Sequence, residues 1–206
     1  MTISSRARKN QILRDILPCE SLKPKWYKRW HVIEAELKQH IRLGVEKPAL
    51  LELGIRDAKV PRHILKKVPT TRYTGIDAFA DVESEVDRGR TREDANRQVM
   101  RNRELAYECS RGWPSQMNII EGYTNQVHSH VKKMFDVVFI DADHSYEAVR
   151  EDIVNYVDKL KYTGVLIGHD YRWPDVYRAV HKCFDSVESH ADNVWLVRNV
   201  FESKLF

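Results

Sequence analysis

The sequence predicts an α/β fold: a doubly wound, mostly parallel sheet with helices on both faces. From residue 49 onward, short apolar runs alternate with stretches of helical periodicity, which is the order of a β-α-β chain. The run 137–140 (VVFI) is apolar at every position, as in strands that helices cover on both sides. Polar, chargeable residues follow several of these runs, where open α/β sheets bind their ligands.

The strands can be placed from their apolar runs and the connections between them from helical spacing. Between the fourth and fifth strands, one helical face carries Tyr146, Val149, Ile153, Val157 and Leu160. Each crossover between parallel strands is expected to be right-handed. The predicted strands are 49–53, 72–76, 117–120, 136–140, 164–168 and 194–200.

Two segments lie outside this alternation. Residues 1–47 are predicted to form a mostly helical preface to a single domain at 48–206, with an apolar set at helical spacing. Residues 80–115 are long and highly charged, and we interpret them as an insertion that is either a lid beside the ligand crevice or a solvated surface helix. Its second half, from Thr91, is predicted to be helical. The residues expected to face inward are Trp26, Trp30, Ile33 and Leu37 in the preface, and Val99, Leu105 and Ala106 in the insertion.

Composition indicates one globular domain in a reducing compartment. The 206 residues suit one α/β domain, and 34 basic against 30 acidic side chains leave a formal charge of +4, which is weak support for a nucleic-acid partner. The three cysteines form no zinc or disulfide pattern, so a cytoplasmic location is the simplest expectation. No apolar run approaches the ~18 residues of a membrane span, and no secretory signal is recognisable.

Five predicted strands end in residues that suit a binding site. Any one of these endings alone is a weak signal, but five in succession are hard to explain by packing. In chain order they are Glu52, Gly54 and Ile55; Gly75 and Asp77; Glu121 and Gly122; Asp141, Asp143 and His144; and Gly168, His169 and Asp170.

The first two endings indicate a cofactor that contains a nucleoside. Gly54 permits a tight turn and close approach of a ligand, and Asp77 closes the next strand, where a carboxylate can accept both hydroxyls of a ribose. The loop has Arg56 and Lys59 where a pyrophosphate-binding G-x-G-x-x-G loop needs glycines, and no P-loop is present. A nucleoside without phosphates fits better, and S-adenosylmethionine is the obvious candidate.

These residues resemble a known family. The segments ELGIRDAK, YTGIDAF, FDVVFIDADHSYEAVREDI and GVLIGHDY are similar to class I S-adenosylmethionine-dependent methyltransferases, over about residues 48–200. The closest resemblance is to a small branch related to metal-dependent O-methyltransferases and cephalosporin-hydroxylase-like proteins. It implies a Rossmann-like, seven-stranded sheet and O-methylation of a hydroxyl on a small molecule or sugar. Relatives often have glycine at the position of Ala58.

The resemblance also implies roles for individual residues. Asp77 would hold the ribose, and Asp141 would lie near the sulfonium. The full cofactor-binding set would be Glu52, Gly54, Ile55, Asp77, Glu121, Gly122 and Asp141. Asp141 and Asp170, with His169 as a third ligand, would hold a divalent ion, Mg²⁺ or Mn²⁺. His144, three residues after Asp141, would be the general base, so His144 and Asp141 form the expected catalytic pair.

The chemistry of the ligand set bears on the choice of ion. Relatives often show Asp-Asn or Glu-Asp where this chain has His169 and Asp170. Mg²⁺ prefers oxygen ligands, and an imidazole shifts preference toward Mn²⁺ or a later transition metal. A bound cation would lower the pKa of a substrate hydroxyl and orient it.

Several alternatives stay open. Asp143 or Ser145 could serve only to cap the following helix. The enzyme could be a metal-independent methyltransferase, with His144 and His169 as base and orienting group. A non-catalytic nucleotide- or nucleic-acid-binding module is a further alternative, and a nicotinamide dehydrogenase ranks last. Tyr171, Trp173 and Pro174 could line an acceptor pocket or cover the sheet edge. The expected partner is the small-molecule acceptor, with a homodimer as an option.

Overall fold

The computed structural model describes residues 27–202, and these form one mixed sheet between two layers of helices. The strands are β1 (Ala49–Leu53), β2 (Arg72–Asp77), β3 (Met117–Glu121), β4 (Phe135–Ile140), β5 (Leu160–Gly168), β6 (Glu188–His190) and β7 (Val194–Val197). The helices are α2 (Arg29–Arg42), α3 (Lys59–Lys67), α4 (Val82–Asp87), α5 (Arg92–Gly112), α6 (Thr124–Val127), α7 (Tyr146–Val157) and α8 (Pro174–Cys183), with 3-10 turns at His128–His130 and Val200–Glu202.

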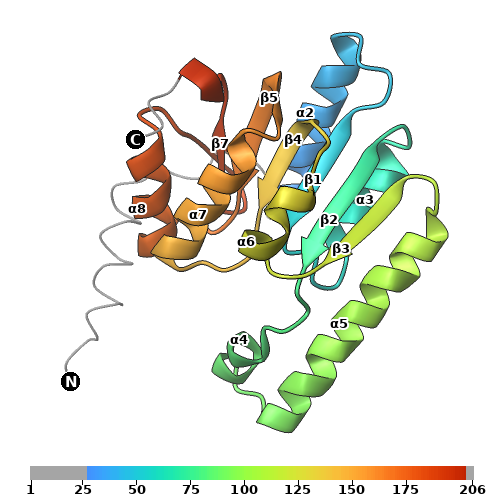
Figure 1. Cartoon of the computed structure of the whole chain (residues 1–206), viewed down its shortest axis with the longest axis vertical. Helices are drawn as coiled ribbons and strands as arrows, with labels where there is room; N and C mark the ends of the chain where they lie inside the picture. The colour runs from blue at the N-terminus through green and yellow to red at the C-terminus, as the bar shows by residue number, and fades with distance from the viewer. Residues whose placement is uncertain (1–26, 203–206) are drawn as a thin grey trace.

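The sheet has the order β3-β2-β1-β4-β5-β7-β6 (Figure 1). The first five of these strands are parallel, and β7 runs antiparallel to both β5 and β6. The predicted fold, mostly parallel and seven-stranded, is therefore confirmed. The order reverses between β1 and β4, so the carboxyl ends of these two strands flank the crevice where such sheets bind ligands.

The first four strands agree with the prediction to within one residue, whereas β5 begins at Leu160 instead of 164. Two further differences occur at the C-terminal edge of the sheet. The last predicted strand, 194–200, ends at Val197, because Asn199 has a positive φ of 51° and a 3-10 turn follows. The short edge strand β6 was not predicted. It forms a hairpin with β7 through Asp192 and Asn193, whose φ angles of 61° and 63° suit the tight turns that Asn and Asp favour.

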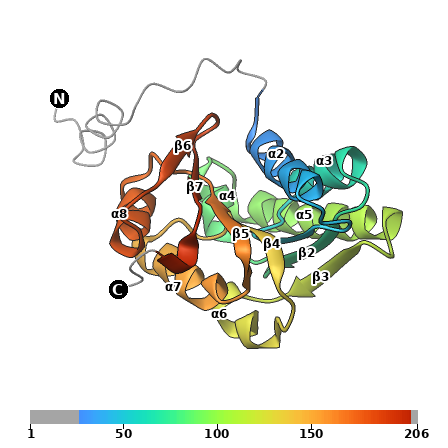
Figure 2. The same ribbon diagram turned by 90° about the horizontal axis from the view of Figure 1, so that it is seen from above.

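Alternate residues of each strand point to opposite helical layers. In β4, Val138 and Ile140 pack with α7 and α8, whereas Val137 and Phe139 pack on the side of α2, α3 and α5. Figure 2 shows the sheet edge-on with one helical layer on each side. All four side chains are at most 3% exposed, which explains why the sequence of this strand is apolar at every position.

Helix α2 is the described part of the predicted helical preface. Its residues Ile33 and Leu37 are fully buried as expected, and Trp30 is partly buried. Trp26 lies outside the described residues. Glu36 of α2 accepts two hydrogen bonds of 2.8 Å from Arg198, which follows β7, and this bidentate pair fastens the helix to the far end of the chain.

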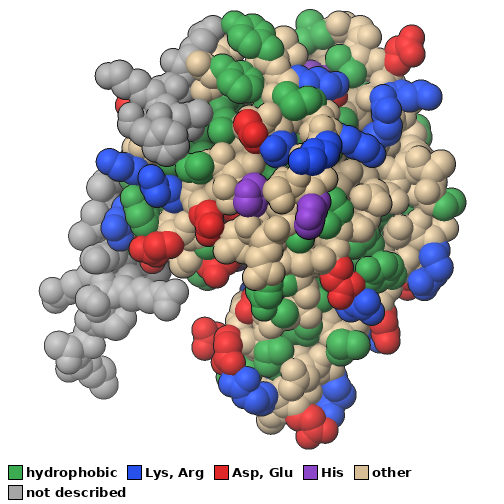
Figure 3. Space-filling model, in the orientation of Figure 1, with side chains coloured by type: hydrophobic (Ala, Val, Ile, Leu, Met, Phe, Trp, Pro, Cys, Tyr) green, Lys and Arg blue, Asp and Glu red, His purple; other side chains and the backbone are tan. Residues whose placement is uncertain are grey.

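The insertion predicted at 80–115 forms the helices α4 and α5. Helix α5 begins after Thr91, which confirms the predicted start, and the hydroxyl of Thr91 accepts from the backbone of Asp94. Val99 and Ala106 face inward, whereas Leu105 is only partly buried. Both helices extend past the carboxyl ends of the strands (Figure 1), and the lobe that they form stands apart from the rest of the visible face (Figure 3).

Helix α7 begins after Ser145, one of the two residues that the sequence offered as its cap. The hydroxyl of Ser145 accepts from the backbone of Ala148 at 3.4 Å, so Ser145 is the N-cap, and Asp143 in turn accepts from the backbone of Ser145. The predicted apolar face packs inward, although its last member, Leu160, opens β5 instead. None of the helices between residues 27 and 202 is long and apolar enough to cross a membrane.

Candidate active site

The site is organised where the loops after β1 and β4 meet. The backbone of Asp141 donates to Leu53 at 2.9 Å, and Gly54 follows with a φ of 91°. A Cβ on Gly54 would lie 2.2 Å from the carbonyl oxygen of Asp141. Glycine is therefore required here both by the backbone conformation and by the contact between the two loops.

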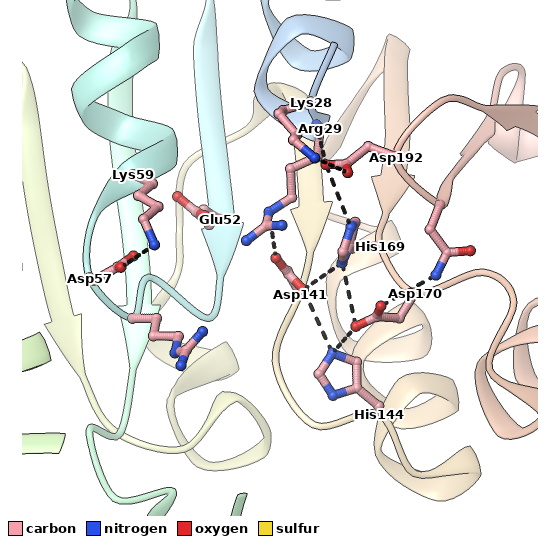
Figure 4. A network of polar contacts seen from close by, with 12 residues as sticks. Lys28, Arg29, Glu52, Asp57, Lys59, Asp141, His144, His169, Asp170 and Asp192 are labelled. Atoms are coloured by element: carbon pink, nitrogen blue, oxygen red, sulfur yellow. Dashed lines mark hydrogen bonds and ion pairs between the residues drawn. The ribbon is translucent and has the colours of Figure 1, made fainter. Parts of the chain in front are cut away.

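Two carboxylates and an imidazole converge next to this contact. The Nε2 atom of His144 lies 2.9 Å from Oδ2 of Asp170 and 3.6 Å from Oδ1 of Asp141 (Figure 4). One ligand atom from each of the three residues lies within 4.8 Å of the others. Asp170 has a positive φ of 53°, a strained backbone conformation of the kind that clusters at functional sites.

His169 approaches the same carboxylates from the end of β5. Its Nδ1 atom is 3.5 Å from Oδ1 of Asp141 and 3.4 Å from Oδ2 of Asp170, and its Nε2 atom is 3.9 Å from Asp192. The structure thus brings together all four residues expected in the metal and base roles. The compact trio contains His144 rather than His169, so the division of roles between the two imidazoles stays a prediction.

The charges of this cluster shift the pKa values of its members. Burial by itself would lower the pKa of His144, but contacts with Asp141 and Asp170 outweigh it and raise the pKa to about 9. The same balance raises the pKa of His169 to about 9. The imidazoles in turn hold the pKa of both aspartates below the usual range, against the effect of burial. In the metal-free protein, both histidines are therefore cationic at neutral pH.

The residues of the trio fit a divalent cation. The Nε2 atom of His144 is buried and makes no well-aligned hydrogen bond, although two carboxylates lie close to it. A buried nitrogen that faces two carboxylates without a well-aligned hydrogen bond is uncommon in a protein interior. Two carboxylate oxygens and one imidazole nitrogen are a donor set that Mn²⁺ or Mg²⁺ accepts, with waters completing the coordination.

Asp77 lies at the end of β2, as predicted for the residue that holds a ribose. Its two carboxylate oxygens accept from the backbone amides of Arg56 and Phe79, each at 2.7 Å. Burial raises the pKa of Asp77, and these hydrogen bonds partly offset the shift. The carboxylate is partly exposed and retains lone pairs, so it can accept further hydrogen bonds from a ligand.

The side chains of Glu52 and Ile55 are buried among core residues. Glu52 is 1% exposed, accepts from the hydroxyl of Tyr73 at 2.5 Å, and has its pKa raised well above the usual range by burial. Ile55 is 3% exposed and packs over Gly75. A cofactor resting on this loop would meet mainly its backbone, and the cofactor role of both residues stays a prediction.

Glu121 and Gly122 follow β3 at the expected edge. Glu121 is held by α5, because Arg103 donates to both of its oxygens at 3.0 and 3.1 Å and Tyr107 donates at 2.8 Å. The backbone of Gly122 donates to the carbonyl of Asp77 at 3.0 Å, which ties this loop to the predicted ribose site. The insertion therefore borders the part of the predicted cofactor site that contains Glu121 and Gly122.

Sequence reasoning missed the basic residues that open α2. Nε of Arg29 lies 3.1 Å from Oδ2 of Asp141, and the backbone of Arg29 donates to Asp192 at 2.9 Å. Nζ of Lys28 is 3.2 Å from the same Asp192, so α2 and the β6–β7 turn close over the site together (Figure 4). The Asp-Asn pair at this turn was a usable hairpin signal, whereas no local pattern connects Arg29 with Asp141.

Comparison with solved structures shows the same fold in methyltransferases. The O-methyltransferase NovP aligns over 82% of this chain and 78% of its own, with 18% identity and a TM-score of 0.60. Rv0187 from MTB, solved with a cofactor bound, aligns over 97% and 99%, with 12% identity and a TM-score of 0.57. CalS11, a TDP-rhamnose 3′-O-methyltransferase, aligns over 96% of both chains, with 13% identity and a TM-score of 0.53.

The sequence itself matches a family model, although no curated protein matches it. The model describes a methyltransferase domain and covers residues 51–171, which is more than half of the chain. This span runs from β1 through the strand ends that carry Asp77, Asp141 and Asp170. The chain therefore belongs to the class I methyltransferase-domain family and is an S-adenosylmethionine-dependent methyltransferase.

Proposed function

We propose that this enzyme transfers the methyl group to a hydroxyl oxygen of a small molecule or sugar, with a divalent cation held by Asp141, Asp170 and one imidazole. The observation that carries the proposal is the convergence of Asp141, His144 and Asp170, with ligand atoms within 4.8 Å of one another. When bound, the cation would lower the pKa of the acceptor hydroxyl and fix its position.

The cofactor would lie along the carboxyl ends of β1, β2 and β4. Asp77 accepts the ribose hydroxyls, the turn at Gly54 allows the cofactor to approach the backbone, and Asp141 lies near the sulfonium. Glu52, Ile55, Glu121 and Gly122 complete the proposed cofactor site. Aligning the oxygen, the methyl carbon and the sulfur is the main task of the protein, and such positioning can contribute up to ~7–11 kcal/mol.

One of the two imidazoles is the third metal ligand, and the other is the general base. His144 is the third ligand in the arrangement that the compact trio favours, and His169 then accepts the hydroxyl proton. In the alternative arrangement, His169 is the ligand and His144 the base. A base must be neutral before it can accept a proton, and contacts with the aspartates keep both imidazoles protonated in the metal-free protein. The raised pKa values are therefore a reason to prefer metal-assisted transfer in this proposal.

The acceptor side of the site carries an aromatic surface. The ring of Trp173 lies 5.0 Å from the ring of His144, and the residue is 42% exposed, whereas Tyr171 is buried in the core. An exposed indole beside the proposed cation suits an apolar or sugar face of an acceptor. The names of NovP and of the TDP-rhamnose 3′-O-methyltransferase CalS11 support oxygen as the methylated atom and a sugar as one acceptor class.

Chelation tests this function directly. Formation of S-adenosylhomocysteine should be followed with a panel of sugar and phenolic hydroxyl acceptors, in Mn²⁺, in Mg²⁺ and in excess chelator. We expect turnover only with an added ion, because the metal-free imidazoles are cationic. Full activity in chelator would show that transfer is metal-independent, and failure of calorimetry to detect S-adenosylhomocysteine binding would contradict the cofactor site itself.

The affinity for the divalent ion should rise with pH. A ligating imidazole must be neutral, and the pKa of His144 is about 9, so binding below this pH releases a proton. Calorimetry with Mn²⁺ should give about tenfold tighter binding per pH unit between pH ~7 and ~9, and little change above. Without metal, the raised pKa stabilises the fold fully below pH ~6.5, and this contribution is lost as the pH rises through ~9.

Two variants assign the imidazole roles in this titration. If His144 is the ligand, His144→Gln should weaken Mn²⁺ binding, whereas His169→Gln should leave the affinity nearly intact and reduce turnover. The reverse pattern would make His169 the ligand and His144 the base. An affinity that does not change between pH ~7 and ~9 in the parent protein would contradict ligation by either histidine.

A further inference from the structure

Three arginines pair with one buried carboxylate in the insertion. Glu85 of α4 is 2% exposed, and one nitrogen of each guanidinium lies within hydrogen-bond distance of its oxygens. The distances are 2.6 Å to Arg56, 2.7 Å to Arg88 and 2.5 Å to Arg90. We call Glu85 and these three residues the arginine cluster.

The arginine cluster carries more positive charge than its structural role requires. Burial raises the pKa of Glu85, but hydrogen bonding and the charges of the arginines outweigh it and hold the pKa below the usual range, so the group is ionised. One carboxylate balances one guanidinium, which leaves a net charge of about +2. One arginine would suffice to neutralise Glu85, and three guanidiniums on one carboxylate repel one another.

The arginines retain donors that face solvent. Their side chains are 48%, 45% and 40% exposed for Arg56, Arg88 and Arg90. Each guanidinium has five N–H donors in a planar fork, of which the contact with Glu85 uses few. Because Glu85 fixes the guanidiniums, an anion could bind without having to order three flexible side chains.

One arginine of the cluster, Arg90, also borders a surface recess. The recess, of about 430 Å³, lies at the start of α5 and is also lined by Thr91, Arg97 and Arg101. Asp94 is the one acidic residue among those lining it, and Arg97 pairs with both Asp94 and Glu93, so the excess positive charge comes from Arg90 and Arg101. The surface next to the cluster therefore has room for a ligand and carries the sign of charge that attracts an anion.

The cluster lies beside the predicted cofactor crevice. The backbone of Arg56 donates to Asp77, the proposed ribose acceptor, at 2.7 Å. Arg56 is the third residue after Leu53, whose carbonyl accepts from the backbone of Asp141. That stretch spans at most about 11 Å. The backbone that carries one arginine of the cluster therefore adjoins both the predicted ribose site and the loop contact at Asp141.

We propose that Arg56, Arg88 and Arg90, held in place by Glu85, bind a phosphate group of the methyl acceptor, which makes the acceptor a phosphorylated small molecule or sugar. This rests on the proposed function. A phosphate monoester carries about −1.5 to −2 charges at pH 7, which matches the charge of the cluster. Bidentate arginine pairing suits phosphate oxygens. The carboxylate of the cofactor carries only one negative charge and matches the cluster less well.

Calorimetry with inorganic pyrophosphate tests the cluster in isolation. The titration is carried out on the whole chain in excess chelator and without cofactor, so neither the ion nor methyl transfer contributes. Arg88→Gln and Arg90→Gln each leave Glu85 with two arginines, which preserves its neutralisation. The control is Arg92→Gln, because Arg92 pairs on the surface with the exposed Glu83 at 2.7 Å.

We expect pyrophosphate binding to weaken about tenfold or more in Arg88→Gln and Arg90→Gln and to stay unchanged in Arg92→Gln. Added salt should also weaken binding in the parent protein. Absence of binding, or equal binding in all variants, would overturn the proposal. Weaker S-adenosylhomocysteine binding in the two cluster variants, with pyrophosphate binding unchanged, would assign the arginines to the cofactor instead. A negative result would leave the chelation and Mn²⁺ experiments unaffected.

Discussion

Asp141→Asn and Asp170→Asn should each reduce methyl transfer by more than about 100-fold and weaken Mn²⁺ binding by at least as much. Each substitution removes a charged oxygen from the compact trio, in which His144 lies 2.9 Å from Asp170 and 3.6 Å from Asp141. Loss of even an outer partner of a metal ligand typically costs 10–100-fold, so loss of a ligand should cost more. Both quantities can be measured on the same preparations, by S-adenosylhomocysteine formation and by calorimetry.

Asp143→Asn is the matched control for this pair. Asp143 belongs to the same loop, is exposed, and uses its side chain to accept from the backbone of Ser145 at 2.7 Å, which an asparagine can also do. Its activity and Mn²⁺ affinity should stay close to those of the parent. If Asp141→Asn and Asp170→Asn remained fully active with or without chelator, the cation would have no part in the reaction.

Gly54→Ala should destabilise the fold by about 2–5 kcal/mol and abolish cofactor binding. The φ of 91° costs a residue with a side chain about 1–2 kcal/mol. The added Cβ would lie 2.2 Å from the carbonyl oxygen of Asp141, and overpacking of this kind costs about 1–3 kcal/mol. For a chain of this size, the melting temperature should fall by roughly 4–20 °C.

Gly44→Ala separates the cost of the positive φ from the cost of overpacking. Gly44 has a nearly identical φ of 95°, but a Cβ there would meet nothing within 4 Å. The control should therefore show only the conformational cost and leave S-adenosylhomocysteine binding unchanged. Equal losses of stability in the two variants would mean that the loops at Gly54 and Asp141 yield easily and do not need this close contact.

The cofactor loop shows what a residue pattern can and cannot predict. The sequence has Arg56 where a pyrophosphate-binding loop needs glycine, and Ala58 where relatives often have glycine. The missing glycines would suggest that this loop has a different shape. In the structure, both residues adopt positive φ angles, 51° and 59°, so the loop keeps the conformation that glycine favours. Because position 56 is arginine and not glycine, its side chain can pair with Glu85 in the arginine cluster. A pattern of glycines was therefore a poor guide to the shape of this loop.

The sequence by itself determined the alternation of strands and helices, the sheet class, and the strand ends that carry Asp77, Asp141, His144 and Asp170. It could do so because periodicity and burial on both faces are local properties of a strand. Only the tertiary structure decided that His144 rather than His169 belongs to the compact trio, that Arg29 and Asp192 close over it, and that Arg56 joins Arg88 and Arg90 on Glu85. These contacts join residues far apart in the chain or depend on differences of an ångström between side chains, and no local pattern encodes either.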